Sequence, residues 1–388
     1  MSLSRRCLSN LDAAATVATV ATVATVATVA ILLLPARSDA QVILKAGDST
    51  FIRFGVSLQA WADFQEMPDA TGTVRNGTQQ NLFLRRARFM MVGQVVEDLS
   101  FYLQLDSSNL GKNKAAGAPF APAVSVLDAF GLWRLSPSFQ LQGGLFYVPF
   151  SRATLTGSRS FLTLDASPGG FIASAPTESI SMRDTGFGAM GFLFGDRLQY
   201  RTGVYQGQRP PGSQASFRYA GRVQYEFFDT ETGYLYQGYV YPGTNLGKKK
   251  ILAVGVGSDN QGDYHAYSAD VFADLPVGKG DAVTANASWF HYDGETRLPT
   301  FPRQNDYVLE AGYYVSSIRT QPFLQYFRQS FSDEASQANN LRKYQAGLNY
   351  YVSQQNLKLT AAYTRFVPDL ASKVSTNQFT IQVQVGYF

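Results

Sequence analysis

Cysteine and histidine are nearly missing from this 388-residue chain, which contains one cysteine and two histidines. The lone cysteine, Cys7, lies close to the amino terminus, so the rest of the chain can form no disulfide and offers no thiol nucleophile. His265 and His291 stand in no local motif that pairs a histidine with an activated nucleophile. Enzyme chemistry therefore has little support, and we expect no catalytic residue, no resident metal and no other cofactor.

Charge of one sign and long apolar runs are also scarce. The formal net charge is +4, which does not point to a nucleic-acid partner. After residue 34 no continuous apolar stretch is long enough for a membrane-spanning helix. If the rest of the chain lies in a membrane, it crosses as strands.

The exception to this scarcity is the amino-terminal stretch. Arg5 and Arg6 are followed by an apolar, low-complexity run from Ala13 to Leu34. Small residues at 38–40 then fit a signal-peptidase site, and we expect residues 1–40 to be a secretory signal peptide and residues 41–388 to form the exported domain. A helical membrane anchor is the alternative, because 13–34 has the length to span a bilayer.

Alternation of apolar and polar residues is what the remaining chain has in abundance. The last segment is typical: Phe379, Ile381, Val383 and Val385 share one parity, and glutamines and threonine occupy the other. A strand sends such sets to opposite faces. Sixteen period-two segments are predicted as strands, at 51–64, 80–96, 99–107, 125–135, 138–149, 186–195, 197–206, 216–228, 250–259, 264–275, 281–293, 305–316, 319–330, 340–352, 355–367 and 376–388.

The predicted connections alternate between short and long, as do the turns and outer loops of bacterial outer-membrane barrels. Two depart from the pattern: 229–249 is long on the short side, and 260–263 is short on the long side. An aromatic content of 14% and the terminal Phe388 suit the aromatic girdles of such barrels. We therefore predict an all-β fold, a transmembrane antiparallel up-and-down barrel of sixteen strands. Parity alone does not separate this barrel from a soluble sandwich.

The longest predicted loop, 150–185, is the third on the long-loop side, and we expect it to fold into the pore. Arginines are the candidate pore residues, because a guanidinium is a forked donor suited to phosphate oxygens. The set comprises Arg86, Arg88, Arg152, Arg159, Arg183 and Arg222. In the second strand, Phe83 and Ala87 are predicted to face lipid, with Arg85 near the outer headgroups. The alternative role for each arginine is an ion pair that braces the wall.

Several segments resemble the phosphate-selective porins O and P. They are 84–89 (Leu-Arg-Arg-Ala-Arg-Phe), Gly93 with the 102–106 strand, 143–151 (Gly-Gly-Leu-Phe-Tyr-Val-Pro-Phe-Ser), 184–186 (Asp-Thr-Gly) and 250–255 (Lys-Ile-Leu-Ala-Val-Gly). The resemblance runs in order along the chain from residue 41. It implies a sixteen-stranded barrel, commonly trimeric, with the third outer loop in the pore and basic residues that pass phosphate or polyphosphate.

These observations predict an outer-membrane porin for passive diffusion of small hydrophilic solutes, with a bias toward anions such as phosphate. Its expected surroundings are outer-membrane lipid and lipopolysaccharide, and its expected assembly is a homotrimer. Three alternatives stay open: a general, non-selective porin, an outer-membrane barrel hydrolase that uses His265 or His291, and a plugged structural barrel.

Overall fold

The computed structural model describes residues 42–47, 49–113, 123–208, 216–232 and 239–388. The predicted signal peptide lies outside them. The elements are β1 (Ile43–Lys45), β2 (Phe51–Pro68), β3 (Arg75–Val96), β4 (Leu99–Asp106), β5 (Ser125–Ser136), β6 (Phe139–Tyr147), α2 (Arg152–Leu155), η1 (Ser158–Ser160), η2 (Ile172–Ser174), β7 (Arg183–Leu193), β8 (Leu198–Tyr205), β9 (Arg218–Glu226), β10 (Ile251–Gln261), β11 (Tyr264–Val277), β12 (Asp281–Asp293), β13 (Gln304–Tyr314), β14 (Thr320–Phe331), η3 (Glu334–Asn339), β15 (Leu341–Ser353), β16 (Leu357–Pro368) and β17 (Thr376–Tyr387).

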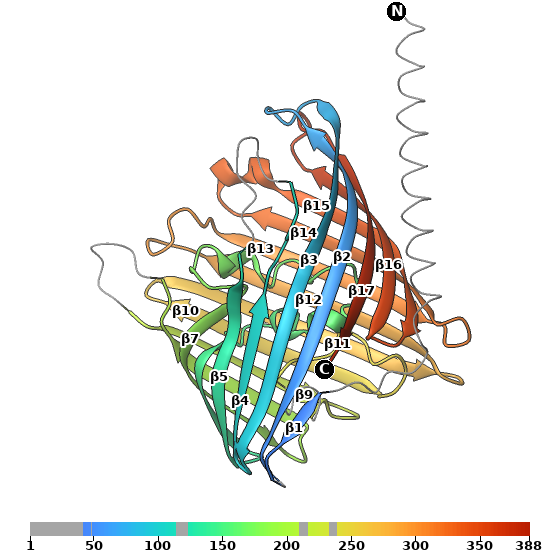
Figure 1. The fold of residues 1–388 in the computed structure, drawn as a ribbon. Helices are drawn as coiled ribbons and strands as arrows, with labels where there is room; N and C mark the ends of the chain where they lie inside the picture. The colour runs from blue at the N-terminus through green and yellow to red at the C-terminus, as the bar shows by residue number, and fades with distance from the viewer. Residues whose placement is uncertain (1–41, 48, 114–122, 209–215, 233–238) are drawn as a thin grey trace, which may run out of the picture. The chain divides into compact units, whose positions relative to one another are not determined.

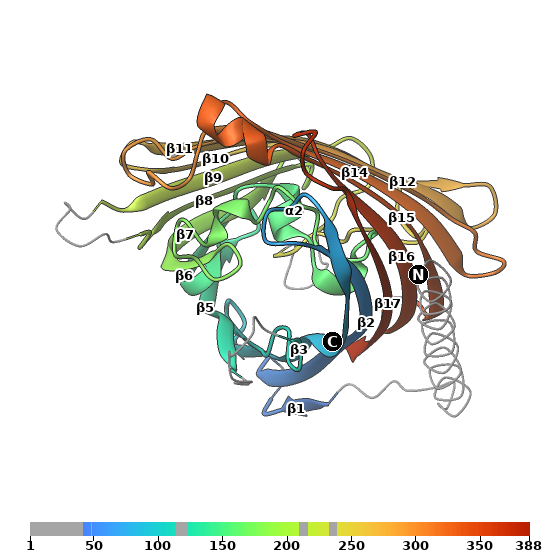
Figure 2. The same ribbon diagram turned by 90° about the horizontal axis from the view of Figure 1, so that it is seen from above.

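The strands β2 to β17 form a closed antiparallel barrel (Figures 1 and 2). Each strand pairs with the next along the chain, and β17 returns to pair with β2 over Gln378–Tyr387 and Val56–Gln65. The short strand β1 pairs with residues 51–53 of β2, beyond the point where β17 ends. The sixteen predicted strands are confirmed in order and position, and β1 is an addition that the pattern did not predict.

The barrel is polar inside and apolar outside, which settles the choice that parity left open. Along β16, Lys358, Thr360 and Thr364 are buried, whereas Tyr363 on the other parity is 46% exposed. Fully buried polar side chains such as Gln59, Asp63, Asp259 and Gln384 line the interior, and large apolar side chains cover the exterior. A soluble sandwich buries its apolar faces instead, so this arrangement is that of a membrane barrel.

A β-bulge in β3 changes which residues face inward. Gln59 pairs with Arg86 and Ala60 with Leu84, so Arg85 is an extra residue without a partner in β2. A bulge inverts the parity of the residues before it. Phe83 therefore points inside, where it meets Trp61 edge-on at 5.7 Å between ring centroids, and the lipid-facing prediction for Phe83 was wrong. Arg85 also turns toward the interior and bonds to Asp165 instead of reaching the outer headgroups.

The two ends of the barrel differ in their connections. One end carries short turns, such as 97–98 and 194–197, and the other carries longer segments, of which 148–182 is the longest. The predicted loop 65–79 is mostly strand, because β2 and β3 continue to Pro68 and Arg75. Asp69 closes this hairpin by accepting hydrogen bonds from the amides of Thr73 and Val74.

Candidate functional site

The loop between β6 and β7, residues 148–182 (here L3), lies inside the barrel, as predicted (Figure 2). Its first turn is α2, where the Ser151 side chain accepts the amide of Thr154 as an N-cap. The Phe150 carbonyl accepts a 2.6 Å hydrogen bond from Ser268 of β11. Gly257 of β10 permits this approach, because a Cβ there would collide with the same carbonyl.

From α2 the loop crosses to the opposite wall. The carbonyls of Ser158 and Arg159 accept hydrogen bonds from Gln59 of β2 and Gln384 of β17. The carbonyls of Phe161 and Leu162 accept from Lys358 of β16 and Asn349 of β15. L3 is thus held by lumen-facing side chains on strands far from its own ends, and it divides the interior.

A second segment enters the interior from the short-turn end. It belongs to the connection between β9 and β10, which the sequence predicted at 229–249 as unusually long for its side. Its described residues are 227–232 and 239–250 (here the inward turn), and residues 239–241 of it are buried. Tyr241 exchanges backbone hydrogen bonds with Leu155 and Gly157 of L3, at 2.8 and 2.9 Å. Tyr239 and Tyr241 are buried. L3 and this inward turn therefore narrow the interior of the barrel together.

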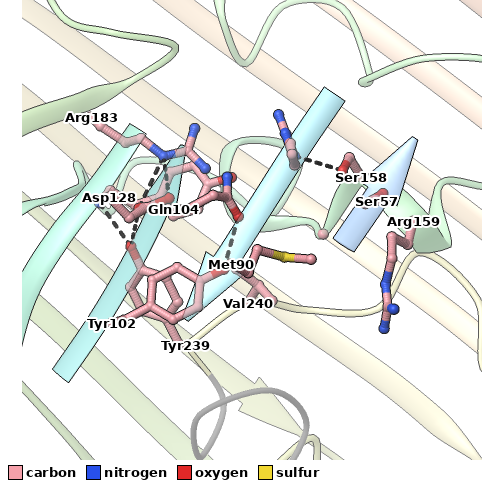
Figure 3. A pocket seen from close by; sticks show the side chains of 13 residues that line it. Ser57, Met90, Tyr102, Gln104, Asp128, Ser158, Arg159, Arg183, Tyr239 and Val240 are labelled. Carbon is pink, nitrogen blue, oxygen red and sulfur yellow. Dashed lines mark hydrogen bonds and ion pairs between the residues drawn. The ribbon is translucent and has the colours of Figure 1, made fainter. Parts of the chain in front are cut away.

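A narrow cavity of about 40 Å³ lies where L3, the inward turn and the wall strands β2 to β5 meet (Figure 3). Its charged lining consists of Arg88, Arg159 and Arg183 against the single carboxylate of Asp128. Figure 3 shows Arg183 and Asp128 together on one side and Ser158 and Arg159 on the other. Three guanidinium groups thus face one carboxylate in this lining.

A wider cavity of about 500 Å³ adjoins the narrow one and shares Arg88, Arg183, Tyr147 and Ser158 with it. Its charged lining is Arg85, Arg86, Arg88 and Arg183 against Asp165 of L3. Serines, among them Ser108, Ser158, Ser167, Ser174 and Ser181, supply hydroxyl groups to the same wall. The two cavities therefore lie next to each other beside L3, and arginines line both.

Most of these arginines also hold the walls in place. Arg85 and Arg86 both bond to Asp165, the former at 2.8 Å, and so tie β3 to L3. Burial alone would raise the pKa of Asp165, but the charges of Arg86 and Arg85 outweigh it and hold this pKa well below its usual range. Asp165 therefore stays charged at neutral pH.

Arg88 and Arg183 are held by further contacts in the wall of the narrow cavity. Arg88 bonds to Asp106 at 3.2 Å and donates to the Ser158 hydroxyl of L3 at 2.7 Å. Arg183 bonds to both oxygens of Asp128 at 3.0 Å, and the Tyr239 hydroxyl donates to the same carboxylate at 2.7 Å. These bonds orient the guanidinium groups and partly neutralise them.

Arg159 differs from the others. It has no ion-pair partner within the part of the chain that the structure describes, and its Nη1 is buried without a hydrogen bond. Its backbone carbonyl, not its side chain, makes the contact with Gln384. Arg159 is therefore the cation in the narrow cavity whose charge is least compensated.

Arg152 and Arg222, the other two candidates, lie in buried ion pairs outside these two cavities. Arg152 bonds to both oxygens of Glu231 in the inward turn, at 2.6 and 2.7 Å, with both side chains 2% exposed. Burial lowers the pKa of Arg152, but Glu231 outweighs it and the net shift is upward. Arg222 bonds to Asp270 at 2.7 Å through two nitrogens. The first contact joins L3 to the inward turn and the second joins β9 to β11. Asp270 also accepts the backbone amide of Arg152 at 3.1 Å and so ties L3 to this wall.

Two parts of this site could not be read from the sequence. The inward orientation of Arg85 depends on the bulge, and parity assigned it to the other face. Glu231 and Tyr239 lie in a segment that the pattern treated as a turn; the only available signal was the unusual length of 229–249.

Both histidines lie at the long-loop end of the barrel. His265 begins β11 and His291 lies near the end of β12, with ring centroids 6.1 Å apart. Neither histidine lines the two arginine-rich cavities, and the hydrogen bonds of their Nδ1 atoms go to the Asp263 carbonyl and to Asn305.

Comparison with known proteins places the chain in a family. Within the described residues no helix has the length and apolar character needed to cross a membrane. The family model for phosphate-selective porin O and P matches residues 54–267, which run from β2 into β11 and include L3 and the inward turn. No curated protein gives a significant match.

Solved structures share the fold at low identity. The chain is similar to OmpF of Salmonella typhi in complex with daunomycin, with a TM-score of 0.58 at 13% identity over 89% of this chain and all of that one. An anion-selective porin from Comamonas acidovorans gives 0.58 at 13%, over 87% and 100%. The trimer form of OmpT, an outer membrane protein of Vibrio cholerae, gives 0.53 at 11%, over 88% and 100%. With the family match over more than half of its length, the chain belongs to the phosphate-selective porin O and P family, porins of the bacterial outer membrane.

Proposed function

We propose that this porin is a passive channel for small hydrophilic anions of the phosphate class. The observation that carries the proposal is the lining of the narrow cavity, where three arginines face one carboxylate. The channel needs no chemical step, because selectivity follows from the charge and width of the passage. The Comamonas acidovorans porin, which shares the fold, is described as anion-selective.

The size of the narrow cavity explains why charge matters there. One water needs roughly 10–15 Å³ of such space, so about 40 Å³ holds only a few waters. An anion that enters loses most of its hydration shell. Guanidinium groups replace the lost water with charge-assisted hydrogen bonds, whereas a cation would meet repulsion as well as dehydration.

The proposed path runs from the long-loop end, taken as extracellular, through the wider cavity to the narrow one. Arg85 and Arg86 attract the anion, and Arg88 and Arg183 are shared by both cavities. Their carboxylate partners keep binding weak enough for release, which conduction requires. Arg152 and Arg222 act at a distance, by fixing the position of L3.

Planar-bilayer recording tests this function. Under a KCl gradient we expect a reversal potential of the sign set by chloride, and we expect added phosphate to reduce the chloride current by competing for the arginines. Conductance without anion preference would instead support the general-porin alternative. A closed barrel with no conductance would contradict both.

The wider setting is also proposed. Residues 1–40 act as a signal peptide that is removed on export, and residues 41–388 form the channel. The channel is a homotrimer surrounded by outer-membrane lipid and lipopolysaccharide; the trimer form of the Vibrio cholerae protein and the family resemblance support this assembly. Amino-terminal sequencing of the outer-membrane form and light scattering of the detergent-purified protein test the two parts separately.

A further inference from the structure

Three potential metal ligands meet on the outer surface of the barrel, away from the passage. His265 on β11 and Asp293 on β12 are direct partners in the antiparallel register, and His291 lies two residues before Asp293 on the same face. One ligand atom from each of the three lies within 4.8 Å of the others. Tyr267, next along this face of β11, is 44% exposed, so the cluster is at the outward-facing rim.

Hydrogen bonds orient both imidazoles for coordination through Nε2. His265 Nδ1 lies 3.0 Å from the Asp263 backbone carbonyl, which can only accept, so Nδ1 carries the proton. His291 Nδ1 lies 3.1 Å from Asn305 Oδ1. Trp289 Nε1, which can only donate, meets the same Asn305 atom at 3.3 Å, consistent with an oxygen there. Such donation from the far nitrogen is how metal-binding histidines are usually held.

The carboxylate of Asp293 can bind a metal ion only if Arg303 moves away from it. Its Oδ2 lies 4.0 Å from His265 Nε2 and 2.5 Å from Arg303 Nε. The Arg303 side chain is 48% exposed and already reaches Glu295 at 3.2 Å. Arg303 can therefore move toward Glu295 and release one Asp293 oxygen, and in doing so it competes with any cation for the cluster.

We propose that His265, His291 and Asp293 bind a divalent transition-metal ion of the Zn²⁺ class. Two imidazole nitrogens and one carboxylate oxygen are a donor set that Zn²⁺ accepts, with water in the fourth position. Imidazole favours this class over Ca²⁺ or Mg²⁺, which prefer oxygen ligands. Tetrahedral ligands at about 2.0–2.2 Å from Zn²⁺ lie roughly 3.4 Å apart, so side-chain movements of about 1 Å complete the site. The ion would join β11 to β12 at the rim.

Metal binding by untagged, chelator-treated protein in detergent tests the proposal. Because the chain has only two histidines, the ligand set can be removed completely. We expect one Zn²⁺ per chain by calorimetry, and Co²⁺ in its place to give the visible absorption of a four-coordinate site. His265→Ala and His291→Ala should each weaken binding at least tenfold. Asp69→Asn, which changes a carboxylate on another rim loop, should leave affinity unchanged.

Arg303→Gln distinguishes loss of a metal ligand from a general loss of structure. Removal of this competing cation should tighten Zn²⁺ binding, whereas damage to the fold would weaken it. Heat-modifiable migration on gels confirms that each variant is a folded barrel. Failure of the folded wild-type chain to bind Zn²⁺ would overturn the proposal, as would unchanged affinity in a His265→Ala/His291→Ala double variant. Reversal potentials measured with and without Zn²⁺ should agree, since the cluster is on the outside; they report separately on the channel.

Discussion

Replacement of Arg159 by alanine is the most direct test of the proposed channel. This side chain lines the narrow cavity, and no ion-pair partner is found for it among the described residues. Its removal therefore leaves no buried carboxylate unpaired there. The backbone contact from Gln384 to the Arg159 carbonyl survives the substitution, so we expect L3 to keep its place.

The size of the effect follows from the geometry. A sphere of about 40 Å³ has a radius near 2 Å, so an ion at its centre is roughly 4 Å from the lining atoms when a ~1.4 Å probe is added. At that distance one charge contributes about 1 kcal/mol in a water-like medium and about 4 kcal/mol at an effective dielectric constant of 20. Anion preference should fall at least about fivefold.

The assay is the reversal potential of single channels under a KCl gradient, with Arg159→Lys and Lys279→Ala as controls. Lysine keeps the charge and should keep most of the preference. Lys279 is exposed on a short turn and lines neither cavity, so its loss removes the same charge from the protein without effect on the passage. An Arg159→Ala channel that conducts with the wild-type reversal potential would refute the assignment of selectivity to the narrow cavity.

Three further predictions concern the loop and the barrel. Glu231→Gln leaves Arg152 charged, buried and unpaired, which should lower the free energy of unfolding by about 3–5 kcal/mol, and the double variant Arg152→Met/Glu231→Gln should restore much of this. The rate of hydrogen exchange at the 152–160 amides should rise in the single variant and return toward the wild-type rate in the double variant. Equal exchange rates in the two variants would contradict the role of the pair. The pKa of Asp165 is depressed, so its stabilisation of L3 persists above the unfolded-state pKa of about 3.9 and is lost only as pH falls toward the lower folded value. The reversal potential should therefore show no change from Asp165 titration between pH 7 and roughly 4. A change in that interval that disappears in Asp165→Asn would show that the carboxyl titrates at a higher pH than this reasoning requires. Leu309→Arg puts a charge on a lipid-facing position that is 54% exposed, and should lower the free energy of unfolding in phospholipid vesicles by about 2–4 kcal/mol, measured by urea titration against Leu309→Ala.

The sequence was sufficient for the barrel because strand periodicity is local. Each strand from β2 to β17 carries its own alternation of apolar and polar residues, so its existence can be read without knowledge of its partners. The length of 150–185 likewise predicted the loop that enters the pore. The alternation did not reveal the bulge at Arg85. The extra residue inverts the parity of the residues before it, so a prediction from uninterrupted alternation put Phe83 on the wrong face.

The tertiary structure alone decided which side chains share a site. Arg152 and Arg159 are seven residues apart, yet one is neutralised by Glu231 of the inward turn and the other faces the narrow cavity. His265 and Asp293 become neighbours only through the register of β11 and β12. Periodicity is set within a strand, whereas register, ion pairing and the burial of residues 239–241 depend on segments distant in the chain, which no local pattern encodes.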